Sequence, residues 1–93
     1  MRIVKILPSF ERSLKKLSSR DKDKLKETLV QFNDFLVSGV FPVGLGFKKI
    51  NHDKYEFRVD IRIRVIVKIE KEYVYLVLAG SHDRVKRYLR EYR

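Results

Sequence analysis

The sequence has 93 residues, of which 44% are hydrophobic and 12% aromatic, and its 22 lysines and arginines outnumber 12 acidic residues to give a formal net charge of +10. This length and hydrophobic content predict one small globular domain and exclude a disordered tail. The absence of cysteine excludes disulfides and thiolate chemistry. The positive charge favours a polyanionic partner, either nucleic acid, an anionic membrane surface or an acidic protein.

The sequence gives no support for a metal centre, a membrane span or an export signal. The two histidines, His52 and His82, lie far apart, and no pair of ligands has a metal-binding spacing. No apolar run approaches the ~18 residues that a membrane span needs, and the start of the chain lacks the apolar core of a secretory signal. We therefore expect a soluble cytoplasmic protein, a single domain over residues 1–93, with no metal and no small-molecule cofactor.

The first half of the chain has the pattern of a short strand followed by two helices. Residues 2–7 are typical of a strand, and the Pro-Ser pair that follows opens a helix with an apolar stripe at helical spacing. That stripe consists of Phe10, Leu14 and Leu17. Ser18 and Asp21 have the spacing of a capping box, which predicts the start of a second helix, and Gly39 is its expected stop. The apolar face of the second helix consists of Leu25, Leu29, Phe32 and Leu36.

The second half follows a glycine-rich stretch and is rich in predicted strands. Polar and apolar side chains alternate in its middle part, and a continuous apolar run predicts a later strand that is covered on both faces. The expected strands are residues 47–50, 55–60, 61–69 and 73–79. A Gly-Ser pair then leads into a last helix, whose apolar stripe is Val85, Tyr88, Leu89 and Tyr92.

The predicted order of elements is β-α-α-β-β-β-β-α. It defines a small α+β domain in which a two-helix hairpin and a C-terminal helix pack on one face of a mostly antiparallel, twisted sheet. The other face is left to charged side chains, and residues 80–88 are expected to close one of its edges.

Charged side chains on two predicted strands form the first candidate site. Glu56 and Arg58 lie on one strand, and Arg62 and Arg64 lie on the next. Cross-strand ion pairs on an ordinary solvated face give the same pattern. Basic groups nevertheless outnumber acidic ones, and arginine is suited to bidentate contact with phosphate. Both interpretations stay open from the pattern alone.

His82 and the remaining basic residues supply further candidates. His82 follows the Gly-Ser pair at the start of the last helix, so it is either a surface residue at a helix end or a proton-transfer group. Lys48 and Lys49 occupy a short strand, where lysine also serves to discourage edge pairing. The basic residues of the last helix, among them Arg84, Lys86 and Arg87, form either a solvated face or a contact with a polyanion.

Four segments, taken in order, carry a resemblance to a known family. They are Phe47-Lys48-Lys49-Ile50, Tyr55-Glu56-Phe57-Arg58-Val59, Ile63-Arg64-Val65-Ile66-Val67 and Gly80-Ser81-His82-Asp83. Together with the order of the elements, they resemble the successive landmarks of the RelE/ParE toxin superfamily, and the Gly-Ser-His-Asp segment is most similar to its YafQ-like branch. The resemblance covers nearly the whole chain and rests on the ordered set, since no single segment is highly specific.

The resemblance implies the toxin of a toxin–antitoxin pair, acting as a metal-independent endoribonuclease that cuts mRNA in the ribosomal A site. Arg64 matches the arginine that contacts the scissile phosphate, and Arg58 would stabilise the transition state. His82 matches a histidine that takes part in cleavage in YafQ-like relatives. Glu56 stands where RelE has a lysine, so it is either a proton-transfer partner or a structural ion pair. The residues expected to bind phosphates of mRNA or ribosomal RNA are Lys48, Lys49, Arg62, Arg84, Lys86, Arg87 and Tyr88.

Two departures from the family pattern keep other functions open. Ile63 replaces the usual tyrosine before the arginine, and Lys86 stands where many relatives carry a tyrosine. Tyr88 offers an alternative match, but residues 86 and 88 point about 200° apart on a helix, so only one of them faces the site. The alternatives are a ParE-like inhibitor of DNA gyrase without nuclease activity and an inactive relative that binds nucleic acid. For a toxin of either kind, the resemblance implies an acidic antitoxin as partner, which we expect to fold over the basic surface.

Overall fold

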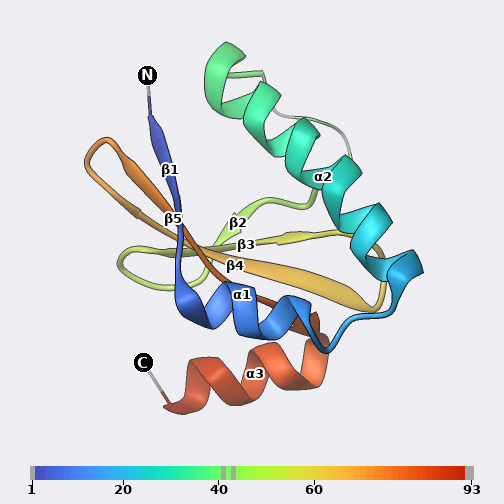
Figure 1. Cartoon of the computed structure of the whole chain (residues 1–93). Coiled ribbons are helices and arrows are strands. Elements are labelled where there is room, and N and C mark those ends of the chain that lie inside the picture. The colour runs from blue at the N-terminus through green and yellow to red at the C-terminus, as the bar shows by residue number, and fades with distance from the viewer. Residues whose placement is uncertain (1, 41, 43, 92–93) are drawn as a thin grey trace.

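The computed structural model describes residues 2–40, 42 and 44–91, and Figure 1 gives their arrangement. The elements, in chain order, are β1 (Ile3–Ile6), α1 (Pro8–Leu14), α2 (Ser19–Ser38), β2 (Lys48–Lys49), β3 (Lys54–Arg58), β4 (Ile63–Glu70), β5 (Tyr73–Ser81) and α3 (His82–Glu91). This order is the predicted one. Tyr92, assigned above to the last helical stripe, lies outside the described residues.

The five strands form one mixed sheet in the order β1-β5-β4-β3-β2. Only the β1–β5 pair is parallel, and the other pairs are antiparallel. Strand β1 pairs with the first half of β5 alone, and α1 continues along the second half. There the Ser9 hydroxyl donates to the carbonyl of Val77 at 2.6 Å, and the Ala79 amide donates to the Ser13 hydroxyl at 3.0 Å. Two serines of a helix thus satisfy backbone groups that a neighbouring strand would otherwise bind.

Helices α1 and α2 cover one face of the sheet with an apolar core. Phe10 of α1 and Phe32 of α2 are buried against Phe57, Val65 and other apolar strand residues. The Phe32 and Phe57 rings stack with their centroids 4.6 Å apart. Alternation along β3 predicts this face correctly, because Phe57 and its half-buried neighbour Tyr55 both point into the core.

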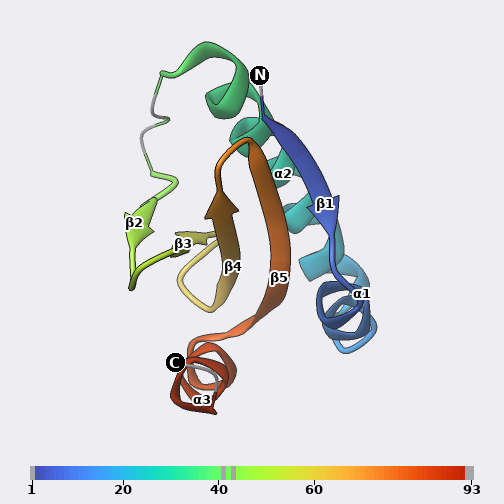
Figure 2. The same cartoon turned by 90° about the vertical axis from the view of Figure 1, so that its left-hand side faces the viewer.

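Helix α3 packs against the opposite face, and the expectation that all helices share one face is wrong in this respect. Val85 of α3 is buried against Ile66, Val77 and Leu78. These apolar strand residues face away from α1 and α2, so they need a cover of their own. In Figure 1 the sheet separates α2 from α3, and Figure 2 shows α3 beyond the end of β5 that lies away from the N-terminus.

The boundaries of α2 follow the predicted caps, whereas α1 is shorter than its apolar stripe. The Ser18 hydroxyl accepts a hydrogen bond from the Asp21 amide at 3.1 Å. Gly39 adopts the left-handed conformation at φ 76° and its amide binds the Phe35 carbonyl. Helix α1 ends at Leu14, and Leu17 packs against the core from the turn that follows.

Residues 59–62 form a turn between β3 and β4, not the ends of two strands as predicted. One carboxylate oxygen of Asp60 accepts hydrogen bonds from the amides of Arg62 and Ile63, both at 2.8 Å. Ile61 is 85% exposed at the tip of the turn. Alternation of apolar and charged residues continues through this turn in the sequence, so the pattern alone extends the strand by two residues.

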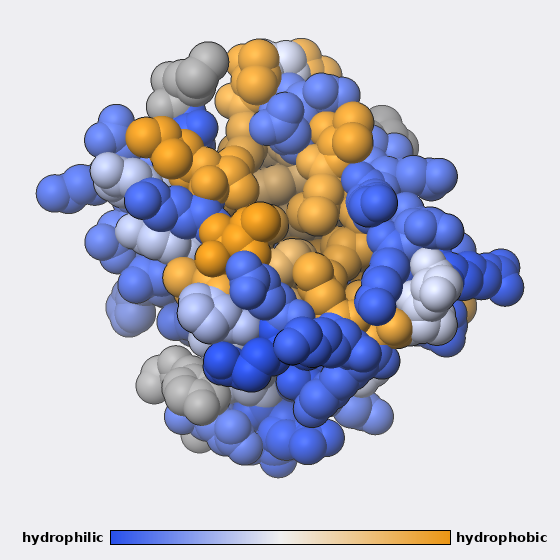
Figure 3. Space-filling model, in the orientation of Figure 1, coloured by the Kyte–Doolittle hydropathy of each residue, from blue (hydrophilic) through white to orange (hydrophobic). Residues whose placement is uncertain are grey.

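Figure 3 shows apolar side chains gathered on the molecular surface between β1 and the C-terminal half of α2. A pocket of about 280 Å³ lies there, and its lining includes Phe35, Leu36, Phe47 and Tyr55. Along β1, Ile3, Val4 and Ile6 are exposed as well. This apolar surface lies on the α2 side of the sheet, away from α3.

Candidate nucleic-acid interface

The pairing of β3, β4 and β5 brings two predicted site residues into one row. Arg58 lies directly opposite Arg64, and Arg64 lies directly opposite Gly80. Residues that face each other across strands project from the same face of a sheet. The two arginines therefore share the face that α3 partly covers.

The next row places Lys48 and Glu56 on the same face. Lys48 pairs with Glu56, which in turn pairs with Ile66. Glu56 is only 7% exposed, and one of its carboxylate oxygens lies 3.2 Å from a terminal nitrogen of Arg64. This ion pair settles which arginine Glu56 contacts. Burying a carboxylate is costly unless it is paired, so the ion pair with Arg64 offsets the burial of Glu56 and fixes the Arg64 side chain.

Arg58 extends over Gly46, in the segment that leads into β2. A Cβ atom at Gly46 would lie 3.1 Å from the Arg58 Nε atom, which is closer than side chains normally pack. Gly46 also has a φ of +61°, a left-handed conformation that favours glycine. Two independent constraints thus require glycine here, and one of them leaves room for the Arg58 side chain.

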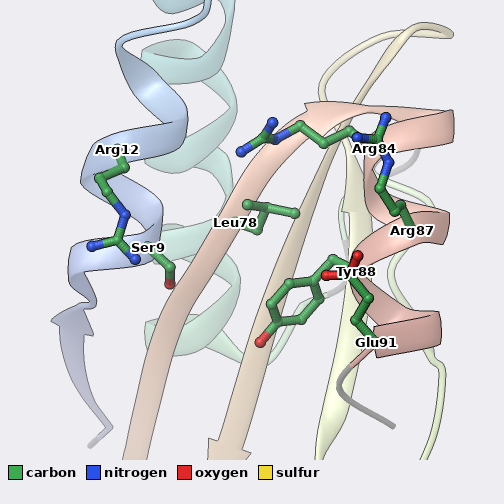
Figure 4. Close-up of a pocket in the computed structure, with 7 residues that line it drawn as sticks. All are labelled: Ser9, Arg12, Leu78, Arg84, Arg87, Tyr88 and Glu91. Atoms are coloured by element: carbon green, nitrogen blue, oxygen red, sulfur yellow. The ribbon is translucent and has the colours of Figure 1, made fainter.

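Arg84 crosses Gly80 in the same manner. A Cβ atom at Gly80 would lie only 2.8 Å from the Cδ atom of Arg84. In Figure 4 the Arg84 side chain runs over strand β5 toward α1. Because Gly80 pairs with Arg64, the side chain of Arg84 comes next to the Arg58–Arg64 row. A glycine inside a strand is a known sign of such a close approach.

Arg64 and Arg84 share an unusual feature of their guanidinium groups. The Nε atom of each is buried and has no hydrogen-bond partner among the described residues. Buried donors in folded proteins are normally paired, and each exception calls for an explanation. The two guanidinium groups lie beside one glycine, and arginines grouped in this way are suited to bind an anion.

His82 is the first residue of α3 and lies two residues after Gly80, which pairs with Arg64. Ser81 pairs with Ile63 at the end of β5, and its hydroxyl accepts a hydrogen bond from the Arg84 amide at 3.2 Å, which caps the helix. His82 itself is exposed. The fold therefore places the histidine backbone at the same end of the sheet as the two arginines.

Arg62 and Lys49, both predicted to contact RNA, are not part of this cluster. Arg62 lies in the β3–β4 turn, and its guanidinium pairs with Asp21 of α2 at 3.1 Å. Lys49 pairs with Tyr55, whose ring packs in the core beneath α2, so Lys49 projects from the opposite face to Lys48. Both positions depend on pairing between distant segments, which the local sequence pattern does not contain.

Helix α3 divides its predicted RNA-binding residues between two sides, as the helical angle between positions 86 and 88 requires. Tyr88, Arg84 and Arg87 line a pocket between α1 and α3. Lys86 lines a second pocket, beside Ile50 and Asn51 of the segment between β2 and β3. Only the first of these pockets adjoins the Arg84 side chain.

Several residues that shape the site carry no functional signal in the sequence. Gly46 and Gly80 provide space for arginines, but both lie just outside the predicted strands 47–50 and 73–79, so the sequence pattern gave no signal for this role. Ser9 and Arg12 of α1 line the pocket between α1 and α3, and their position depends on tertiary packing.

Comparison with solved structures places this fold among bacterial and archaeal toxins. No family model and no curated protein sequence matches the chain. YafQ from E. coli is similar at a TM-score of 0.67 and 12% identity, over 91% of this chain and 98% of YafQ. The RelB–RelE antitoxin–toxin complex from Methanococcus jannaschii is similar at a TM-score of 0.69 and 16% identity, over 90% of this chain and 96% of the matched chain. The YoeB dimer from Staphylococcus aureus is similar at a TM-score of 0.65 and 13% identity, over 87% of this chain and 97% of the matched chain.

These similarities show that the chain has the RelE-like toxin fold, as the sequence resemblance predicted. The fold class is confirmed: a small α+β structure with helices on a five-stranded, mostly antiparallel sheet. Within the described residues, no helix has the length and apolar character to cross a membrane. The fold does not assign an activity, which must be argued from the site.

Proposed function

We propose that this protein is the toxin of a toxin–antitoxin pair and acts as an endoribonuclease that cuts mRNA on the ribosome. The observation that carries the proposal is the cluster of Arg58, Arg64 and Arg84 at the end of the sheet where His82 begins α3. Among the residues that the structure describes, the buried Nε donors of Arg64 and Arg84 have no partner. Such a cluster is suited to a phosphodiester, because arginine binds phosphate oxygens through paired donors.

In the proposed reaction the 2′-hydroxyl of one nucleotide attacks the adjacent phosphorus. The new P–O bond forms a 2′,3′-cyclic phosphate, and the bond to the 5′-oxygen of the next nucleotide breaks. A base takes the 2′-hydroxyl proton, an acid protonates the leaving oxygen, and cations neutralise the charge that develops on the phosphoryl oxygens. Arg64 and Arg58 are the proposed cations, so the scheme requires no metal ion.

His82 is the proposed proton-transfer residue. Imidazole exchanges protons near neutral pH, and the exposed position of His82 at the start of α3 leaves it accessible to a bound strand. Glu56 is proposed as a positioning residue, because its carboxylate is buried and engaged by Arg64 at 3.2 Å. Its pairing with Arg64 orients the guanidinium toward the scissile phosphate.

Other basic residues would bind RNA phosphates around the cleavage site. Lys48 shares the face of Glu56, and Lys86 and Arg87 are exposed on α3. Contacts of this kind are independent of sequence and weaken with salt. We propose that they hold mRNA in the A site and contact neighbouring ribosomal RNA in the cytoplasm.

An acidic antitoxin is the proposed protein partner. Solved neighbours include complexes of YafQ with DinJ and of RelE with RelB. The net charge of +10 favours an acidic segment. The exposed apolar residues of β1 and the pocket beside α2 offer a second, hydrophobic contact on the face shown in Figure 3.

Primer extension on a reporter mRNA, incubated with the purified protein with and without translating ribosomes, tests the proposal. We expect cuts at A-site codons only when ribosomes are present. His82→Ala should abolish these cuts, and His52→Ala, a change of the exposed histidine in the turn before β3, should leave them intact. Intact message under both conditions would contradict the nuclease, and DNA damage in cells without loss of translation would point to gyrase inhibition.

A further inference from the structure

A groove between α1 and α3 is lined mainly by cationic and hydroxyl groups. Its volume is about 270 Å³, with Leu78 of β5 as its apolar floor. Arg12 and Ser9 line it from α1, and Arg84, Arg87, Tyr88 and Glu91 line it from α3. Figure 4 shows the α1 and α3 residues on opposite sides of this floor, with the Tyr88 ring extending toward α1.

Positive charge is concentrated at one end of this groove. No carboxylate of the described residues forms an ion pair with Arg12, Arg84 or Arg87. Among the described residues, Glu91 is the single acidic residue that lines the groove; it comes from the last turn of α3, whereas Arg84 comes from the first turn. An anion therefore has a defined place in the groove, near Arg84 and away from Glu91.

Arg84 connects this groove to the cluster described above. Its side chain passes over Gly80, which pairs with Arg64, and its buried Nε atom has no partner among the described residues. In Figure 4 the guanidinium extends toward α1. A ligand held in the groove thus lies next to one held by Arg64, with Arg84 between them.

We propose that the α1–α3 groove is a binding site for a backbone phosphate of single-stranded RNA, adjacent to the phosphate held by Arg64. The inference rests on the proposed function for its choice of RNA. Arg12 from α1 and Arg84 from α3 contact the phosphate from two sides. Tyr88 lies one helical turn beyond Arg84, and its ring offers an apolar surface for the attached base. Arg12 is a binding residue here, with no part in bond cleavage.

The test measures binding of the full chain to a fluorescent, fully 2′-O-methylated hexanucleotide RNA, which cannot be cleaved by attack of a 2′-hydroxyl. Fluorescence anisotropy is recorded at several salt concentrations. Arg12→Ala should weaken binding about tenfold and lower the slope of log affinity against log salt by about 0.7, the loss of one phosphate contact on a single strand. Arg12→Lys should restore part of the binding affinity and part of the salt dependence.

Arg20→Ala is the matched control, because Arg20 is also an exposed arginine in a helix and lies outside the groove. It should bind the hexanucleotide like the wild type. The NMR signal of the Arg84 Nε–H group should shift when the hexanucleotide is added and should shift less with inorganic phosphate. Wild-type affinity in Arg12→Ala, or equal losses in Arg12→Ala and Arg20→Ala, would overturn the inference.

Cleavage of ribosome-bound mRNA separates this inference from the proposed function. Arg12→Ala should require more protein for half-maximal cleavage and should keep the wild-type rate at saturation. If the wild type cuts mRNA and Arg12→Ala binds the hexanucleotide normally, the proposal of an RNA-binding groove is wrong, whereas the proposed nuclease activity is supported. If the wild type cuts no mRNA while Arg12→Ala selectively loses binding of the hexanucleotide, the proposal of an RNA-binding groove is supported and the proposed nuclease activity is wrong.

Discussion

The face of the sheet under α1 and α2 is filled by apolar side chains, whereas the face under α3 combines apolar contacts with buried charge. On the first face Phe32 and Phe57 stack at 4.6 Å. On the second, Val85 covers a small apolar cluster, and Arg64 and Glu56 lie beside it as an ion pair.

The difference indicates a division of tasks within one sheet. Apolar burial on the α2 face supplies stability that does not depend on a ligand. On the charged face, the Nε donors of Arg64 and Arg84 have no partner within the described part of the chain, and buried donors without partners cost stability. Such local conflicts with good packing are typical of functional sites.

The largest expected effect comes from breaking the aromatic core. Phe32→Ala should lower the free energy of unfolding by ~3–5 kcal/mol, because it removes a fully buried ring and leaves a cavity. Phe32 is only 2% exposed. Urea unfolding followed by circular dichroism measures the loss. Val37→Ala, at a position 68% exposed on the same helix, should change stability by less than ~0.5 kcal/mol. Similar losses of unfolding free energy in Phe32→Ala and Val37→Ala would contradict the stabilising role of the aromatic core.

A smaller loss should follow when the contact between α1 and β5 is broken. Ser13→Ala removes the hydroxyl that accepts from the Ala79 amide at 3.0 Å and leaves that buried donor without a partner. The expected cost is ~1–3 kcal/mol. Hydrogen exchange at the Ala79 amide should accelerate more than exchange at Val67 in β4. Unchanged protection of Ala79 would argue against this role of Ser13.

On the charged face, Glu56→Gln should cost ~1–2 kcal/mol of stability. The amide oxygen still accepts from Arg64, but the attraction between opposite charges is lost. If Glu56 positions Arg64, cleavage of ribosome-bound mRNA should fall by about tenfold or less. A loss of a hundredfold or more with the fold intact is the size expected of a general base, and it would move Glu56 from positioning to proton transfer.

The smallest effect concerns the β3–β4 turn and depends on pH. Burial raises the pKa of Asp60, but hydrogen bonds from the Ile63 and Arg62 amides and from Lys24 outweigh it, so the pKa is lowered. Its stabilising contribution is therefore present above the unfolded-state pKa of about 3.9 and is lost as pH falls through the lower folded value. Asp60→Asn should destabilise the protein at pH 7, and the difference from wild type should shrink toward pH 3. If urea unfolding gives the same stability difference between wild type and Asp60→Asn at pH 7 and pH 3, the charge of Asp60 does not stabilise the turn.

The order of the elements could be predicted from the sequence because it depends on local signals. Ser18 and Gly39 mark the ends of α2 through their own backbone and side-chain chemistry. Alternation along β3 identifies the core face through Phe57. The turn at residues 59–62 was missed, because Asp60 stabilises it through hydrogen bonds that leave the hydropathy pattern unchanged.

The residue types of the site were predictable, but their grouping was not. Lys48 and Lys49 are adjacent in sequence and project from opposite faces, since pairing with β3 decides the side. Arg62 has the same charge as Arg64 and pairs instead with Asp21 of a distant helix. The contribution of Arg12 depends on how α1 packs beside β5, and no pattern within α1 indicates that position.

The parallel pairing of β1 with β5 has a consequence for the order of folding. It joins Ile3 to Tyr73, whereas β3, β4 and β5 are joined to their neighbours in sequence by short turns. Contacts between distant segments require closure of a long loop and form slowly. The contact of Ser9 in α1 with Val77 in β5 also joins distant segments, so we expect the groove opposite Arg84 to be completed late. We therefore expect strands β3 to β5 to pair before the proposed binding groove is complete.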